Sequence, residues 1–420
     1  MASLDEILAG RQERKDLIDR LIVPGGCVVS VHANVPGPKK RTSAAHYVVG
    51  RFAALFRGGA DTVAYGDNAD GPFFLARFSD ITAKNKKIEA MQAEETTPLG
   101  RLVDIDVYDG EGYSLSRKIP RRCYVCDEPA MVCGRLRKHT TIELLAAMDA
   151  IVREDACSLA FALIDRAIRT ELELDPKFGL VTPMSKGSHH DMDFSLMKAA
   201  KDVIVPYLSQ MFVLGIEADT EAGVFQAARK IGVAAEQSML TATGGVNAYK
   251  GLIFSLGLAA TAAGIISGSG LPFASLFAVV ARLAAPLDGE LNDEKIQTIG
   301  MQAWREHRIG GARREALAGF PAVRQALVWL KAGKQSDLYR TLCGLIGIVE
   351  DTVLLKRAGS PKRYEEIRSM FATMSDFSSK TIDEVSWACT KEGLSFGGSA
   401  DLLVVTVFLK EFQDTFALPL

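Results

Sequence analysis

Hydrophobic and polar positions alternate in two different ways along the 420 residues of this chain. In residues 1–140, short segments with a period of two are interspersed with helical patterns. The segment 27–34 places cysteine, valine and alanine on one strand face and Ser30, His32 and Asn34 on the other. Further strands are expected over 62–66, 72–78 and 102–108, and a helix over 4–21.

From residue 141 onward, apolar residues recur at intervals of three and four, which is typical of amphipathic helices. The pattern predicts helices over 192–214, 221–242, 249–267, 273–286, 294–307, 322–332, 335–357, 361–373, 382–390 and 400–416. We therefore expect two domains, an α/β (or α+β) domain over 1–150 and a larger all-α helical domain over 151–420. No linker rich in proline, serine or glycine separates them, so the boundary is expected inside a helix.

One uncharged stretch, between Lys250 and Arg282, is long enough to span a bilayer. Glycine, serine and proline at 268–272 divide it, which favours two buried helices of a large helical core over a membrane span. The N-terminal segment is charged throughout and lacks the apolar core of a secretory signal. We therefore expect a cytoplasmic protein that has no membrane partner.

The overall charge argues against one class of partner. The 49 basic and 51 acidic side chains leave a formal charge of −2, so nothing in this balance favours binding to nucleic acid. The charges are unevenly distributed, because residues 1–140 carry 21 basic and 18 acidic side chains, whereas the remainder carries 28 and 33. The first region is thus slightly basic and the helical region is acidic.

The strand predicted over 102–108 contains a pair of carboxylates. When its valines and isoleucine face the core, Asp104 and Asp106 project together from the opposite face. Such a pair can hold Mg²⁺ against a triphosphate, although a solvated strand face would show the same spacing. Clustered basic residues favour the metal and phosphate interpretation. These residues are Lys39, Lys40, Arg101, Arg117, Lys118, Arg121, Arg122, Arg135, Arg137 and Lys138.

A second cluster combines three cysteines and a histidine, namely Cys123, Cys126, Cys133 and His139. Three thiolates and an imidazole can complete a small structural Zn²⁺ site. The six-residue middle spacing is tight for a zinc knuckle, and reduced structural cysteines or redox-sensitive thiols would give the same pattern. The sequence leaves these three interpretations open.

Three motifs give the first region a resemblance to a known family. Residues 30–40, 98–107 and 121–139 resemble, in order, the motifs of the holo-acyl-carrier-protein synthase of citrate lyase. The resemblance implies a nucleotidyltransferase-like domain. It also implies the reaction of that family, in which a serine hydroxyl of the citrate lyase acyl carrier protein (gamma subunit) attacks the α-phosphate of triphosphoribosyl-dephospho-CoA, and pyrophosphate leaves. The residues it implies are Asp104 and Asp106 as Mg²⁺ ligands and Lys40, Arg101 and Arg122 as phosphate contacts.

Polar residues near predicted helix ends are candidates for chemistry in the helical region. His189 and Asp191 precede a helix as a possible metal or general-base site, although N-terminal caps and surface residues have the same pattern. Glu236 shares a helix face with apolar residues, and a buried carboxylate there would need a cation such as Arg229 or Lys250.

A glycine-rich helix junction follows at 243–251, where Asn247 and Lys250 could bind phosphate at a helix N-terminus. Three more polar clusters border helices, at 310–316, 350–357 and 395–401. Each has an ordinary explanation as a cap or an interhelical ion pair. Their occurrence together in one helical domain suggests a shared pocket.

The helical region, over about 151–420, resembles the triphosphoribosyl-dephospho-CoA synthase family. The motifs are at 176–181, 188–192, 229–232, Glu236, 243–251, 313–316, 351–352 and 395–403. The resemblance implies that the 2′-hydroxyl of 3′-dephospho-CoA attacks C1 of the ribose of ATP and adenine departs. This reaction needs a base and an acid around an oxocarbenium-like state. The expected base is Glu236, Asp191 or His189, and the expected substrate contacts are Lys177, His189, Arg229, Asn247, Lys250, Arg313, Asp351 and Asp401.

This region departs from the family pattern at several motif positions. Phe178 and Phe396 stand where the family commonly has proline, and Val353 where it has asparagine. Ala248 and Tyr249 replace threonine and histidine, so a phenol stands where an imidazole acid could act.

The leading hypothesis is a bifunctional enzyme that makes the citrate lyase prosthetic group and then attaches it. ATP and 3′-dephospho-CoA are its expected substrates, and Mg²⁺ is its expected cofactor. In one alternative, only the N-terminal transferase is active and the helical region binds or delivers the precursor. In another, the chain is a zinc-stabilised interaction protein without catalysis.

Overall fold

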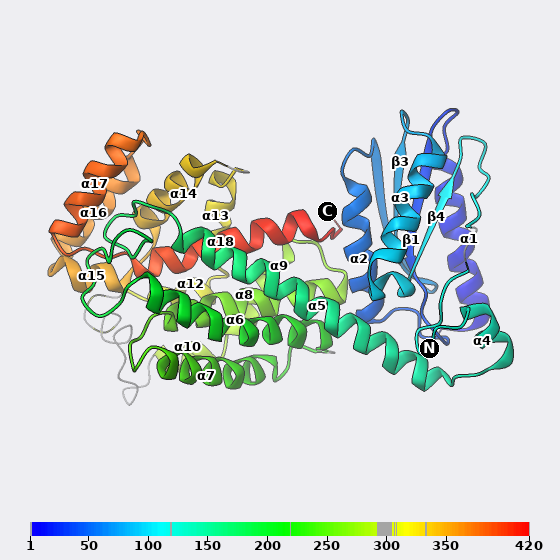
Figure 1. The fold of residues 1–420 in the computed structure, drawn as a ribbon, viewed down its shortest axis with the longest axis horizontal. Coiled ribbons are helices and arrows are strands. Elements are labelled where there is room, and N and C mark those ends of the chain that lie inside the picture. The colour runs from blue at the N-terminus through cyan, green and yellow to red at the C-terminus, as the bar shows by residue number, and fades with distance from the viewer. Residues whose placement is uncertain are drawn as a thin grey trace. The chain divides into compact units, whose positions relative to one another are not determined.

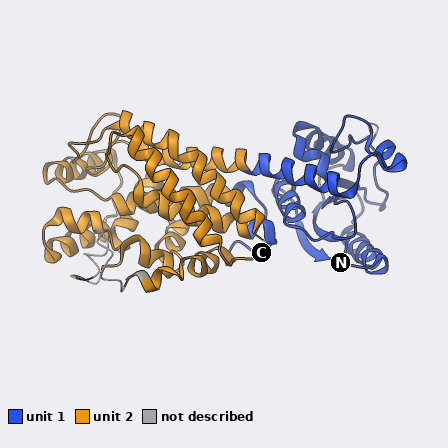
Figure 2. Cartoon of the chain, turned by 90° about the horizontal axis from the view of Figure 1, so that it is seen from below, with its two compact units in different colours: residues 1–156, 266–273, 413–420 blue, residues 157–265, 274–412 orange. Residues whose placement is uncertain are grey.

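A computed structural model describes residues 2–117, 120–218, 220–291, 305, 307, 309–331 and 334–419. The chain divides into two compact units (Figure 2). Unit 1 comprises residues 1–156, 266–273 and 413–420, and unit 2 comprises residues 157–265 and 274–412. The first division falls within the long helix α5 (Thr141–Leu172). Unit 1 also takes two short segments from the distant part of the chain, which no local pattern of apolar residues indicates.

Unit 1 is built on a four-stranded sheet with the strand order β2-β3-β1-β4. Its strands are β1 (Cys27–Ala33), β2 (Thr62–Asn68), β3 (Gly71–Phe78) and β4 (Val103–Tyr108), close to the four predicted segments. All three pairings are antiparallel, so the unit is of the α+β kind and not a parallel α/β fold. Its other elements are α1 (Leu4–Leu21), α2 (Ser43–Arg57), α3 (Ala83–Thr96), the 3₁₀ turn η1 (Pro98–Leu102) and α4 (Ala130–Leu136).

Helices cover both faces of this sheet (Figure 1). Helix α2 packs against β1 and β3, and α3 packs against β4. Helix α1 packs on the other face, where Ile18 joins Val28 and Phe73 in a buried cluster. Since side chains of a strand alternate, Ser30 and His32 share the face of Val28. The polar face predicted for β1 is therefore the one beneath α1.

Unit 2 consists of helices and connecting loops in its described residues (Figure 1). Its longer helices, after α5, are α6 (Phe194–Glu217), α7 (Val224–Ala242), α8 (Lys250–Ser269) and α18 (Gly397–Thr415). The shorter ones are α9 (Ser275–Ala284), α10 (Leu287–Leu291), α12 (Gly311–Leu317), α13 (Pro321–Trp329), α14 (Gln335–Ile348), α15 (Thr352–Ala358), α16 (Pro361–Thr373) and α17 (Ser379–Lys391).

Most predicted helices coincide with these elements, with two exceptions. The helix predicted over 294–307 lies outside the described residues except for positions 305 and 307. The single helix predicted over 335–357 is wrong, because the chain forms α14 and α15 with a break between them. Asp351 begins α15 as its N-cap, accepting hydrogen bonds from the N–H groups of Val353 and Leu354 at 2.9 and 3.1 Å.

Helices α6 and α8 are long and apolar enough to cross a membrane, judged by length and composition alone. In α8, 89% of an apolar 18-residue stretch is buried inside the protein, and in α6 the share of such a stretch is 61%. Core helices of large helical domains have this property. The uncharged stretch forms α8 and α9, which are separated at Gly270 (φ +63°), as the sequence predicted.

Helices α6 and α8 approach each other closely at two glycines. A Cβ added at Gly264 would lie 2.0 Å from the backbone oxygen of Phe212. A Cβ added at Gly215 would lie 2.1 Å from the backbone oxygen of Thr261. The two helices therefore pack backbone against backbone here, which only glycine allows.

We expect Gly264→Ala to lower the free energy of unfolding by roughly 1–3 kcal/mol, because the added methyl group forces α6 and α8 apart. Equilibrium unfolding in urea would measure the change. Gly289→Ala in α10 is the matched control, since a Cβ there meets no atom within 4 Å. Equal unfolding free energies for the two variants would contradict the close packing.

Candidate active sites

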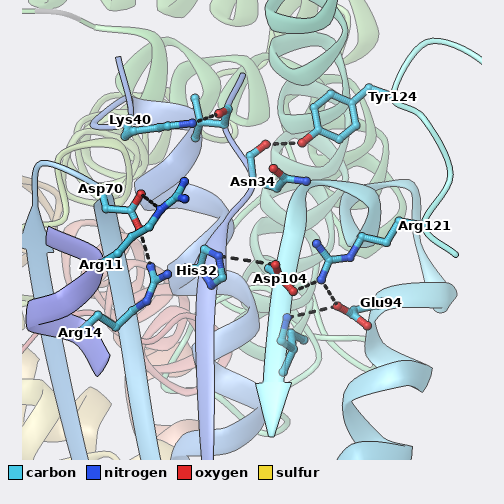
Figure 3. A network of polar contacts seen from close by, with 12 residues as sticks. Arg11, Arg14, His32, Asn34, Lys40, Asp70, Glu94, Asp104, Arg121 and Tyr124 are labelled. Carbon is cyan, nitrogen blue, oxygen red and sulfur yellow. Dashed lines mark hydrogen bonds and ion pairs between the residues drawn. The ribbon is translucent and has the colours of Figure 1, made fainter. Parts of the chain in front are cut away.

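The first candidate site lies where β1 and β4 pair on the polar face of the sheet (Figure 3). The antiparallel register places His32 opposite Asp104 and Ser30 opposite Asp106, so all four side chains project from one face. The ligating atoms of His32, Asp104 and Asp106 lie within 4.8 Å of one another. His32 was not among the predicted site residues, although the alternation of β1 already placed it on the polar face.

Arg121 connects this site to a buried carboxylate (Figure 3). Its guanidinium contacts Asp104 Oδ1 and lies 3.3 Å from Glu94 Oε1. Glu94 is only 6% exposed, accepts a hydrogen bond from the Ile105 N–H at 3.1 Å and pairs with Arg117 at 2.8 Å. Because a buried carboxylate is stable only when its oxygens are paired, Glu94 holds Arg121 beside Asp104.

Burial controls the protonation of this site. Desolvation holds the pKa of His32 well below its usual range, and the cations Arg14 and Arg121 lower it further. The imidazole of His32 is therefore neutral at pH 7. Desolvation raises the pKa of Asp106, and the cations Lys87 and Arg14 oppose this effect.

Helix α1 and the segment after β1 supply further cations to the same face. Arg11 and Arg14 pair with Asp70 at 3.0 and 3.1 Å (Figure 3). The ammonium group of Lys40 donates a hydrogen bond to the backbone oxygen of Val35 at 2.5 Å. Partial burial lowers the pKa of Lys40, and Asp70 opposes this effect. Such a collection of cations suits a phosphate-rich substrate.

The other predicted phosphate contacts, Arg101 and Arg122, lie at Asp127. Their N–O distances to Asp127 are 3.3 and 3.7 Å. The side chains of Arg122 and Asp127 are 67% and 81% exposed, so this ion pair faces solvent. Adjacent side chains of an extended segment point in opposite directions, which explains why Arg121 and not Arg122 reaches Asp104.

In unit 2, three predicted polar clusters meet at the first turns of α12, α15 and α18. Besides capping α15, the carboxylate of Asp351 accepts hydrogen bonds from the Ser399 N–H at 2.8 Å and its hydroxyl at 3.0 Å. The Gly310 N–H donates to Glu350 Oε2 at 2.7 Å. The segments 310–316, 350–357 and 395–401 therefore lie together, and the pocket they were predicted to share stays a prediction.

His189 joins this group through Ser395. Its Nε2 lies 3.0 Å from the Ser395 hydroxyl, and Arg357 donates to the backbone oxygen of Ser188 at 3.4 Å. Desolvation, reinforced by Arg357, lowers the pKa of His189, so its imidazole is neutral at pH 7. Asp191, another predicted base, is exposed in the loop before α6.

A buried ion pair of unit 2 lies near two further ionisable groups, Tyr249 and Asp401. Lys177 Nζ is 2.6 Å from Glu171 Oε1, and the two side chains are 1% and 6% exposed. Burial raises the pKa of Tyr249 well above its usual range, and the carboxylates of Glu171 and Asp401 raise it further. Within the described residues, the buried Tyr249 hydroxyl has no hydrogen-bond partner.

Asp401 is brought to this place by a close approach of α8 and α18. A Cβ added at Gly251 would lie 2.2 Å from Asp401 Oδ2, so the glycine leaves room for the carboxylate. Desolvation raises the pKa of Asp401 well above its usual range, and the nearby carboxylates of Asp351 and Glu171 act in the same direction. The poorly solvated carboxylate of Asp401, from the motif at 395–403, thus lies against the motif at 243–251.

The remaining predicted residues of unit 2 lie on its helices, except for Asn247 in the loop before α8. Lys250 Nζ is 2.5 Å from Glu236 Oε1, and the Asn247 side chain accepts the Lys250 N–H at 3.1 Å. Lys250 is therefore a cationic partner of Glu236, whose side chain is 30% exposed. Arg229 is an exposed residue of α7, and Arg313 is a partly buried residue of α12.

Two departures from the family pattern occupy one aromatic cluster. Phe178 and Phe396 are fully buried, and the ring of each lies 5.1 Å from that of Phe371 in an edge arrangement. The two replacements therefore pack around a common partner.

Comparison with known proteins assigns both regions. Residues 157–419 match the family described as ATP:dephospho-CoA triphosphoribosyl transferase, and residues 2–155 match apo-citrate lyase phosphoribosyl-dephospho-CoA transferase. The chain is 28% identical to Protein CitXG of Haemophilus influenzae, an alignment that covers 98% of this chain and 96% of that protein. It is 26% identical to Protein CitXG of Leuconostoc mesenteroides, with coverage of 97% and 96%.

A third relative matches the helical region. It is the 2-(5''-triphosphoribosyl)-3'-dephosphocoenzyme-A synthase of Haemophilus ducreyi, which is 30% identical over 68% of this chain and 98% of its own length. The two regions thus define a transferase with two parts. The chain belongs to the ATP:dephospho-CoA triphosphoribosyl transferase family, fused behind an apo-citrate lyase phosphoribosyl-dephospho-CoA transferase region. The fusion predicted from the motifs is confirmed.

Glu315 lies in the 310–316 cluster and has an unusual protonation equilibrium. Burial raises the pKa of Glu315 to about 7, against the opposing effect of a hydrogen bond from the Ala322 N–H. That hydrogen bond reaches Glu315 Oε2 at 3.2 Å. A carboxyl with this pKa changes its charge near neutral pH.

We expect stability to fall with pH because of Glu315. Its protonated form is favoured by folding, so this contribution is complete below the ordinary pKa of 4.5 and is lost as pH rises through about 7. Glu315→Gln should remove a loss of roughly 1–3 kcal/mol over this interval. Urea unfolding at several pH values would measure it, with the exposed Glu365→Gln as control. Parallel pH profiles for the wild type and Glu315→Gln would contradict the raised pKa.

Proposed function

We propose that this chain makes the prosthetic group of citrate lyase and attaches it. The helical region combines ATP with 3′-dephospho-CoA to give 2′-(5″-triphosphoribosyl)-3′-dephospho-CoA and adenine. The N-terminal region transfers phosphoribosyl-dephospho-CoA to a serine of the citrate lyase acyl carrier protein, releasing pyrophosphate. The observation that carries this proposal is the end-to-end match of two families whose descriptions name consecutive steps.

The N-terminal region acts in this proposal as a nucleotidyltransferase-like domain. Asp104 and Asp106 would hold Mg²⁺, because two carboxylates on one strand face are hard oxygen ligands of the kind this ion prefers. When bound, the ion would neutralise phosphate charge as pyrophosphate leaves. The arginines around the pair, Arg14 and Arg121, would bind phosphate oxygens and orient the α-phosphate.

His32 is suited to the proton transfer that this reaction needs. The serine hydroxyl of the carrier protein loses its proton as it attacks phosphorus. The imidazole of His32 is neutral, and its Nε2 lies 3.6 Å from Asp104 Oδ2. In this proposal His32 accepts the serine proton as the oxygen–phosphorus bond forms. Because the lowered pKa of His32 disfavours an imidazolium, the nearby Asp104 carboxylate is needed to stabilise it.

We expect Asp104→Asn and Asp106→Asn to slow modification of the carrier protein by at least roughly 100-fold, because both carboxylate charges are needed near the phosphates. Intact-mass spectrometry of the carrier protein, with precursor supplied, would measure the rate. Adenine release by the helical region should remain at the wild-type rate.

The control for these variants is Asp80→Asn, which changes an exposed aspartate in the loop after β3. It should modify the carrier at the wild-type rate. Full modification by both Asp104→Asn and Asp106→Asn would show that the aspartate pair has been assigned wrongly.

The helical region is proposed to transfer ribose through an oxocarbenium-like state. Asp401 would accept the proton of the 2′-hydroxyl, because the close approach at Gly251 places this carboxylate near Tyr249. The buried hydroxyl of Tyr249 would donate a hydrogen bond to the departing adenine. Lys250, Asn247, Arg229 and Arg313 would contact phosphates, and Glu236, Asp191 and His189 stay alternative bases.

We expect Tyr249→Phe to lower kcat for adenine release by roughly 10–100-fold, because the departing adenine loses its hydrogen-bond donor. Chromatography of adenine from ATP and dephospho-CoA would measure the rate. Carrier modification with supplied precursor should be unchanged in the same variant.

The matched control is Tyr207→Phe, whose hydroxyl lies 2.9 Å from that of Ser238 on neighbouring helices. An unchanged kcat in Tyr249→Phe would remove Tyr249 from the mechanism. If the wild type released no adenine but still modified the carrier with supplied precursor, the synthase half of the proposal would fail.

A further inference from the structure

The cysteines and histidine of the N-terminal region converge in space. Cys123 and Cys126 lie in the loop after β4, Cys133 lies in α4, and His139 lies between α4 and α5. One ligating atom from each of these four residues lies within 4.8 Å of the others. The Sγ of Cys126 is 3.4 Å from the Sγ of Cys133 and 3.3 Å from Nε2 of His139.

These distances fit four ligands around one small ion. Zinc bonds of about 2.3 Å to sulfur and about 2.0 Å to nitrogen place tetrahedral ligands roughly 3.5–3.8 Å apart. A disulfide would need a sulfur–sulfur distance of about 2.0 Å. All three cysteines are free thiols in the structure, and Cys123 and Cys133 are only 3% and 5% exposed.

The segment that carries the cluster has little apolar core of its own. Its large apolar side chains are mostly exposed, at 45% for Val125, 56% for Met131, 39% for Val132 and 71% for Leu136. Helix α4 has seven residues, too few for an isolated helix to be stable. Segments with so small a core usually fold around disulfides or a metal ion.

The backbone also turns in the direction that completes the cluster. Arg137 ends α4 in the left-handed conformation, at φ +47°, which non-glycine residues rarely adopt. The Lys138 N–H then donates to the backbone oxygen of Cys133 at 3.0 Å. This turn returns the chain so that His139 faces Cys126.

We propose that Cys123, Cys126, Cys133 and His139 bind one structural Zn²⁺ ion. Four protein ligands leave no open position for substrate or water, so the site is structural and not catalytic. Thiolate and imidazole donors select zinc over the hard cations that the aspartate pair prefers. The ion would replace the missing apolar core of this segment.

The zinc site also has a consequence for the adjacent active site. Arg121 lies two residues before Cys123, and Arg101 donates a hydrogen bond to the Cys123 backbone oxygen at 3.3 Å. The hydroxyl of Tyr124 contacts the backbone oxygen of Asn34, at the end of the polar strand face. Zinc would therefore fix the segment that positions Arg121 against Asp104, a role that rests on the proposed transfer function.

The test is metal analysis of the untagged full-length chain, purified under reducing conditions without chelator. Inductively coupled plasma mass spectrometry should find one zinc per chain. Cys126→Ser should lose it, whereas Cys157→Ser, which changes a free cysteine of α5, should retain it. Absence of zinc from the wild type, or retention of full zinc by Cys126→Ser, would overturn the proposal.

A second measurement does not depend on a variant that folds. Zinc is removed from the wild-type chain with a chelator and replaced by Co²⁺. Tetrahedral cobalt with thiolate ligands should give intense visible bands and a thiolate charge-transfer band. Weak octahedral bands, or a Cys126–Cys133 disulfide seen by mass spectrometry in the reduced preparation, would overturn the site.

The positioning role has its own readout. Zinc removal should lower carrier modification at least 10-fold without changing adenine release, and zinc addition should restore it. Unchanged carrier modification would overturn the positioning role. A zinc-loaded wild type that never modifies the carrier would instead refute the proposed transfer function.

Discussion

The N-terminal site depends on the contacts that the buried carboxylate of Glu94 makes. It accepts the Ile105 N–H from β4 and pairs with Arg117 and Arg121, so it joins α3, the strand and the loop that follows. Without those donors a carboxylate with 6% exposure would be strongly unfavourable. The same pairing leaves Arg121 beside Asp104, so one structural requirement also sets the geometry of the active site.

Both candidate sites place ionisable groups where water is scarce. In unit 1, desolvation acts on His32 and Asp106 in opposite chemical directions, since it makes the imidazole easier to deprotonate and the carboxyl easier to protonate. In unit 2, desolvation raises the pKa of both Tyr249 and Asp401. Ionisable groups in such surroundings stabilise the folded protein less than apolar groups would, and they are typical of functional sites.

Whether a helix or strand could be predicted from the sequence depended on which of its residues are buried. Strand β4 was predicted because one buried face enforces a period of two, and its Val103, Ile105 and Val107 are fully buried. Helix α3 could not be delimited, because its buried positions include Lys86, Lys87 and Glu94. Lys87 and Glu94 have partners from β4 and the following loop, and Lys86 lies over the ring of Phe78 in β3. No local pattern contains these partners.

The sequence by itself determined the division into a mixed and a helical region, the two family resemblances and the common face of Asp104 and Asp106. These depend on local periodicity and on motifs, which are properties of neighbouring residues. Only the tertiary structure decided that His32 and Arg121 join the aspartates, and that Asp401 faces Gly251 and Tyr249. The reason is that strand register and helix packing bring together residues whose separation along the chain carries no information about their distance in space.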